Sequence, residues 1–178
     1  MTRQARCASH AFFALFSLAA FLCCGSLPGR AGDSTLSVQL DTSRAGPRVV
    51  ESLTRQRILR DYRFAWRSLS EAVEFNTLNP LNGPFVGDAK RWLSETVTSQ
   101  QKSGISQRYT HQSHELGAVF YAPEGDVIEL HDTARYELEI LDAGKAVDSQ
   151  PIVVHYVVLM TPGSDRWVIR QLQAVPQF

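Results

Sequence analysis

His155 lies in the middle of the decapeptide PIVVHYVVLM, residues 151–160, whose β-branched and aromatic residues predict a β-strand. A histidine can act as a general base near neutral pH when a carboxyl or hydroxyl group orients its ring. Both faces of this strand are apolar, so its periodicity does not decide which face meets the core. If Tyr156 points inward with the larger apolar set, His155 lies on the outer face. We favour that structural interpretation over a base in a pocket or a residue at an interface.

Carboxylates are the other side chains that could act as a base inside the domain. The strand expected over residues 133–141 alternates between an apolar and a charged side, with Tyr136, Leu138 and Ile140 against Arg135, Glu137 and Glu139. We expect the charged side to face solvent. No strand then offers an obvious inward carboxylate, and Asp132 and Glu129 are the nearest exceptions, beside an expected kink.

His111 and His114 form a His-x-x-His pair. This spacing brings two imidazoles to one side of a helix but to opposite faces of a strand, and we expect a strand here. The chain has three cysteines, all within its first 24 residues, so the rest has no cysteine ligand and no thiol nucleophile. The sequence therefore predicts no metal site and no cofactor.

Arginines form a stripe along the first expected helix: Arg60, Arg63 and Arg67, with Arg57 beside them. Acidic residues are interspersed, so a solvated helix face supported by pairs four residues apart accounts for the stripe. The alternative is a docking surface for an acidic partner. A set of aromatic residues could instead line an apolar ligand pocket at the mouth of the domain: Tyr62, Trp66, Trp92, Tyr136 and Tyr156.

Residues 1–31 read as a secretory signal peptide. Arg3 and Arg6 precede the apolar run of residues 11–24, and small residues before Gly32 provide a cleavage site. An uncleaved membrane anchor is the alternative, because the apolar run is close to the minimum length that spans a bilayer. Residues 32–47 are rich in Gly, Ser, Thr and Asp and read as a flexible linker, with a brief extended piece over 36–40.

The remaining residues, 48–178, predict one α+β domain. Apolar steps of three and four predict a long helix over about 48–75, and Asp88 and Gly104 bracket a second helix. After Gly104 the period changes to two, which predicts about four long strands in a curved antiparallel sheet packed against the helices. Asp142–Lys145 is the expected turn of one hairpin.

This order of elements resembles the NTF2-like superfamily, an α+β cone. The resemblance is carried by RILRDYRFAWRSLSEAV, GDAKRWLSETV and the terminal hairpin VVHYVVLMTPGSDRWVIRQLQ. Within that superfamily, HELGAVFY followed by a charged strand and DSQPIVVHY is most similar to the IMS-type domain of cyanobacterial and plastid division proteins. The superfamily contains enzymes, transport factors and secretion subunits, so the resemblance implies a fold and leaves function to the site.

We expect an exported, periplasmic or extracellular, non-catalytic domain that binds a protein or peptide partner in the cell envelope through its sheet or cone mouth. One alternative is a small enzyme like ketosteroid isomerase or SnoaL, or an apolar-ligand-binding protein, with a base and a hydrogen-bond donor among His155, Asp132, Tyr62 and Tyr136. Another is an inner-membrane-anchored subunit of an envelope assembly. Residues 32–178 have a net charge of −3, because three of the 18 basic residues and none of the 18 acidic ones precede them. That balance gives no reason to expect nucleic-acid binding. An open sheet of this kind could also form a homodimer.

Overall fold

A computed structural model describes residues 36–178. The expectations for residues 1–31 lie outside the described residues. The elements follow in the order β1 (Ser37–Asp41), α1 (Ser52–Glu74), the short 3₁₀ helix η1 (Asn79–Asn82), α2 (Gly87–Ser103), β2 (Ile105–Tyr121), β3 (Ile128–Asp142), β4 (Lys145–Pro162) and β5 (Trp167–Val175). In residues 36–178, no helix is both long and apolar enough to cross a membrane.

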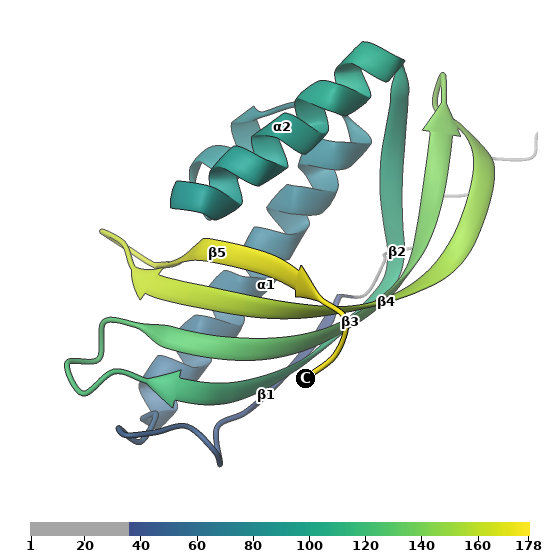
Figure 1. Cartoon of the computed structure of the whole chain (residues 1–178). Helices are drawn as coiled ribbons and strands as arrows, with labels where there is room; N and C mark the ends of the chain where they lie inside the picture. Colours follow the sequence, from purple (N-terminus) through teal and green to yellow (C-terminus); the bar gives the residue numbers. More distant parts are fainter. Residues whose placement is uncertain (1–35) are drawn as a thin grey trace, which may run out of the picture. The chain divides into compact units, whose positions relative to one another are not determined.

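The five strands form one open, mixed sheet in the order β1-β2-β3-β4-β5 (Figure 1). Strand β1 pairs with β2 in parallel, and every other neighbouring pair is antiparallel. The predicted α+β class is confirmed, but the prediction of about four antiparallel strands forming a cone is corrected to a mixed, unclosed sheet of five. The additional strand, β1, comes from the segment interpreted as a linker, where a brief extended piece was expected over residues 36–40.

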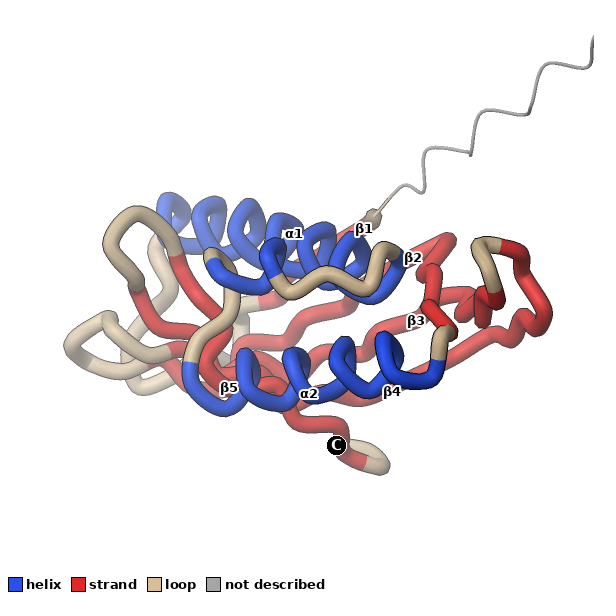
Figure 2. Tube along the Cα trace, turned by 90° about the horizontal axis from the view of Figure 1, so that it is seen from above, coloured by secondary structure: helices blue, strands red, loops and turns tan. Residues whose placement is uncertain are grey.

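Both helices cover the same face of the sheet (Figures 1 and 2). Helix α1 buries a stripe with steps of three and four residues, as expected: Ile58, Tyr62, Ala65, Trp66, Leu69, Ala72 and Val73. Helix α2 buries Ala89, Leu93 and Val97 and ends at Gly104, whose φ of 73° is the left-handed conformation that favours glycine at this position. Trp92, expected on the same apolar side, is 44% exposed because it lies at the margin of that stripe.

A bulge in β2 changes which of its side chains face the helices. Thr110 pairs with Glu137 and Ser113 with Arg135, so two residues of β2 stand opposite one of β3. His111, in the bulge, has a φ of 52°. The extra residue reverses the alternation of the strand, so Gln112 and His114 face the core while His111 is exposed.

The edge strand β1 is held by two arginines of α1. Arg55 donates to the Leu40 carbonyl oxygen at 2.8 Å, and Arg63 donates to the Val38 carbonyl oxygen at 2.9 Å. These bonds satisfy backbone acceptors on a strand that has only one neighbour in the sheet. Arg63, predicted as a partner-binding residue, is therefore occupied in tethering β1 to α1.

Replacing Arg63 with Ala should lower the free energy of unfolding by about 1–2 kcal/mol, since it removes a hydrogen bond from a charged donor to a backbone carbonyl. Denaturant unfolding measures the loss, and amide hydrogen exchange should accelerate in β1. The matched control is Arg67→Ala, which removes an exposed arginine with no hydrogen bond to another described residue and should cost less than about 0.5 kcal/mol. Equal losses in the two variants would show that Arg63 does not hold the edge strand.

Candidate functional site

A buried polar cluster joins α1, β2 and β3. The Tyr62 hydroxyl donates to Asp132 Oδ2 at 2.7 Å, and His114 Nδ1 lies 2.8 Å from the same oxygen. The side chains of His114 and Asp132 are fully buried, and Tyr62 has no exposed surface. The structure thus brings together Asp132 and Tyr62, two of the four candidate catalytic residues. The imidazole beside them belongs to His114, which the sequence analysis considered only as a metal ligand.

The expectation that no strand offers an obvious inward carboxylate is corrected at Asp132, which was named as one of the two nearest exceptions. Asp132 shares the inward face of β3 with Leu130 and Ala134, which are both buried. It meets His114 because the bulge at His111 turns the following residues of β2 inward. Within residues 36–178, no group of three or more His, Cys, Asp and Glu residues is placed to hold a metal ion.

Aromatic rings enclose this cluster. The Trp66 ring centroid lies 4.2 Å from that of His114 and 5.8 Å from that of Tyr156. Burial, together with the negative charge of Asp132, raises the pKa of Tyr62 well above its ordinary value, so the phenol remains a neutral donor. His114 Nε2, Asp132 Oδ1 and the Trp66 indole nitrogen have no hydrogen-bond partner among the described residues.

This arrangement has the parts of an acid–base pair, because a carboxylate that orients one ring nitrogen leaves the other available as a base. A substrate, however, has no path from solvent to this His114–Asp132 pair. Neither His114 nor Asp132 reaches the surface, and the clefts described below are lined by other residues. In this conformation the cluster can order the core but cannot meet a molecule from solution.

His155 lies on the opposite face of the sheet from Tyr156. Its Nδ1 is 3.2 Å from Thr133 Oγ1, and its ring is 5.1 Å from the ring of Phe178. Tyr156 packs inward against Trp66, which is the orientation that places His155 outside. His155 is not brought together with Asp132 or Tyr62.

The five aromatic residues predicted to line a pocket do not surround one cavity. Tyr62, Trp66 and Tyr156 are buried in the core beside His114. Tyr136 packs against Tyr109 at a centroid distance of 4.8 Å. Trp92 lies apart from them, where it lines a groove of about 370 Å³ between α2 and β5.

The predicted arginine stripe divides into residues with different roles. Arg60 forms two hydrogen bonds with Asp61, at 2.7 and 3.2 Å, whereas Arg63 holds β1 and Arg67 is exposed. Asp61 is buried, and its second oxygen accepts the Trp167 backbone N–H at 2.8 Å. This carboxylate therefore fixes the start of β5 against α1.

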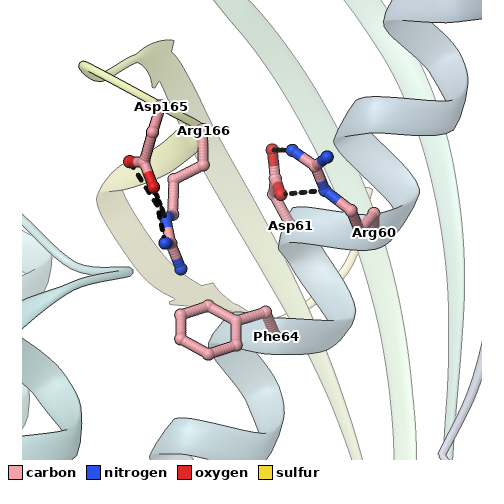
Figure 3. Close-up of a pocket in the computed structure, with 5 residues that line it drawn as sticks. All are labelled: Arg60, Asp61, Phe64, Asp165 and Arg166. Atoms are coloured by element: carbon pink, nitrogen blue, oxygen red, sulfur yellow. Dashed lines mark hydrogen bonds and ion pairs between the residues drawn. The ribbon is translucent and has the colours of Figure 1, made fainter.

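An open cleft lies where α1 meets the turn between β4 and β5 (Figure 3). It has a volume of about 260 Å³ and is lined by Arg60, Asp61, Phe64, Asp165 and Arg166. A neighbouring hollow of about 300 Å³ shares four of these residues and adds Arg57, Trp167 and the turn residues Pro162–Ser164. Sequence reasoning missed Phe64 and Arg166 here, because a contact between a helix and a distant turn leaves no signal in local spacing.

The Arg166 guanidinium lies over the Phe64 ring, 4.6 Å from its centroid, and pairs with Asp165 at 2.6 Å. The Arg166–Asp165 and Arg60–Asp61 pairs stand side by side on the two walls of this cleft (Figure 3). The surface so formed presents the Arg60 and Arg166 guanidinium groups, the Asp165 carboxylate and the Phe64 ring to solvent.

Comparisons with known proteins yield a fold and no family. No protein-family model and no curated protein matches the chain. The intermembrane-space region of the chloroplast protein ARC6 superposes with a TM-score of 0.56 at 12% identity, covering 72% of this chain and 98% of that one. The fold resembles that of the ARC6 intermembrane-space region. A de novo designed β-sheet protein also matches, with a TM-score of 0.36 at 18% identity over 67% of this chain and 88% of the design.

Proposed function

We propose that residues 36–178 form a non-catalytic, NTF2-like and IMS-like domain that binds a protein or peptide partner in the cell envelope. The observation that carries the proposal is the enclosure of the Tyr62–Asp132–His114 cluster. This buried acid–base pair is enclosed by aromatic rings, whereas the arginine-lined cleft is open. A domain so built suits binding at its surface better than turnover in its interior.

Export of the protein is part of this proposal. It rests on the charged and apolar pattern of residues 1–31. The similarity of the fold to the intermembrane-space region of ARC6 also supports a location of this domain in the envelope, outside the innermost compartment. An intact N-terminus on the mature protein would favour the alternative of a membrane-anchored subunit of an envelope assembly.

The competing proposal is a small enzyme of the ketosteroid-isomerase or SnoaL kind. The observation in its favour is the His114–Asp132 contact at 2.8 Å, which leaves His114 Nε2 without a described partner. His114 would be its base and Tyr62 its hydrogen-bond donor. Such an enzyme would require the aromatic enclosure around Trp66 to open.

Affinity capture of the tagged full chain from the envelope of its own host, followed by native mass spectrometry, tests the proposal. We expect a stoichiometric protein or peptide partner whose isolated form rebinds the protein, and equal recovery of that partner with the conservative variant His114→Asn. Asparagine keeps a donor near the position of Nδ1. A retained small molecule that the wild type converts and His114→Asn does not would overturn the proposal in favour of the enzyme.

A further inference from the structure

We propose that the cleft between α1 and the β4–β5 turn binds an acidic peptide segment that carries an aromatic side chain. This inference rests on the proposed function and names the surface and the chemistry of its partner. Arg57, Arg60, Phe64 and Arg166 are the residues that would contact the segment.

The charges around the cleft favour an anion. The guanidinium groups of Arg60 and Arg166 line the cleft together with the carboxylates of Asp61 and Asp165, and Arg57 adds a third guanidinium in the neighbouring hollow. The Asp61 side chain is only 4% exposed, and its oxygens already accept from Arg60 and from the Trp167 backbone. Arg60 balances Asp61, and Arg166 pairs with Asp165, so Arg57 supplies the excess positive charge that favours an incoming anion.

The arginines differ in how many hydrogen bonds and ion pairs they already form within the protein. Arg57 is exposed and has no hydrogen bond or ion pair with another described residue. The Arg60 side chain is 62% exposed although it pairs with Asp61. A guanidinium presents five N–H donors in a planar fork, so both residues can donate to a carboxylate of the partner while Arg60 keeps its contact with Asp61.

Phe64 supplies the aromatic preference. It is 39% exposed in the middle of α1, and Arg166 covers one side of its ring. An aromatic side chain of the partner could pack against the Phe64 edge or stack on the guanidinium plane. Such contacts suit the shallow cleft of about 260 Å³ better than an enclosed small molecule.

The cleft is fixed in shape before any partner arrives. Asp61 joins α1 to the first residue of β5, and the β4–β5 turn is closed by the Gly163 N–H donating to the Arg166 carbonyl at 2.7 Å. Groups held in place lose little freedom on binding, which favours affinity.

Pairing of a partner strand with the sheet edges is less well supported. At β1, two backbone acceptors are already bound by Arg55 and Arg63. At β5, Ile169 exchanges hydrogen bonds with Pro84 and Val86. Along the half of β4 that extends beyond β5, Pro151 lacks the N–H donor that a ladder needs. The structure therefore favours recognition of the partner by side chains at the cleft over pairing of a partner strand with the sheet.

Fluorescence anisotropy with the full chain tests this proposal, using a fluorescein-labelled peptide of alternating Glu and Phe. Two control peptides replace every Glu with Gln or every Phe with Ala. We expect saturable binding of the Glu/Phe peptide, binding at least about tenfold weaker for the Gln peptide, and a smaller loss for the Ala peptide. Raising the salt concentration should weaken the binding.

Arg57→Glu is the decisive variant, because Arg57 is exposed and has no hydrogen bond or ion pair with another described residue. It should weaken peptide binding at least about tenfold. The matched control is Arg91→Glu on α2, a charge reversal at a 67%-exposed arginine outside the cleft, which should change affinity less than about twofold. Equal losses in both variants, equal binding of the Gln peptide, or binding to phosphatidylglycerol vesicles in place of the peptide would overturn the assignment.

The isolated envelope partner separates the two proposals. If wild type and Arg57→Glu bind it equally, the cleft assignment fails and the proposed function stands. If neither binds any partner, the proposed function fails.

Discussion

Replacing Asp132 with Ala should lower the free energy of unfolding by about 3–5 kcal/mol, a large part of the stability of a domain of this size. The substitution removes the common acceptor of Tyr62 and His114 and leaves both polar groups buried without a partner. Urea or thermal unfolding followed by circular dichroism measures the loss.

Asp132→Asn should be milder, at about 1–3 kcal/mol, because the amide oxygen still accepts one of the two hydrogen bonds. Asp148→Ala is the matched control, an exposed aspartate on β4, and should change stability by less than about 0.5 kcal/mol. If Asp132→Ala unfolds with the wild-type midpoint, the buried cluster does not hold the core together.

Stability should fall steeply as the pH rises above about 10. Burial is the main cause that raises the pKa of Tyr62, Tyr109 and Tyr156 well above the ordinary value of a tyrosine. The unfolded chain releases these protons near pH 10, whereas the folded chain retains them. The native state therefore binds more protons above pH 10, and each pH unit costs about 1.4 kcal/mol for each of the three tyrosines.

At pH 11 the combined loss should be about 4 kcal/mol relative to pH 9, measured by urea unfolding at each pH. Tyr109→Phe should remove up to about a third of this dependence, because it removes one of the three phenols whose pKa is raised most and leaves the Tyr62–Asp132 contact intact. Tyr136, whose pKa burial also raises, adds a smaller contribution. A free energy of unfolding that stays flat from pH 9 to pH 11 would contradict the burial of these phenols.

Local periodicity was sufficient to predict the helices and most of the sheet. The helix expected over about 48–75 spans Ser52–Glu74, and the hairpin expected at Asp142–Lys145 joins β3 to β4. Both follow from side-chain spacing and turn residues, which depend only on near neighbours in the chain. Strand β1 has five residues and pairs with β2 more than seventy positions away. Its place in the sheet therefore depends on long-range contacts, which local spacing does not reveal.

The buried cluster was partly predictable. Asp132 and Tyr136 are four residues apart on one strand and so share a face, which identifies Asp132 as inward once Tyr136 is taken as inward. The expected kink obscured that inference. The inward orientation of His114 could not be predicted, because a bulge of one residue at His111 reverses the alternation of β2. No residue type at that position indicates a bulge.

We propose that the buried Tyr62–Asp132–His114 cluster stabilises the core and that the open cleft binds the partner. The affinity of the envelope partner for two variants tests this most directly. His114→Asn, measured at a temperature where it remains folded, should bind the partner within about twofold of wild type, whereas Arg57→Glu should bind it at least about tenfold more weakly. The reverse result, with affinity lost in His114→Asn and kept in Arg57→Glu, would contradict the account and return the function to the interior of the domain.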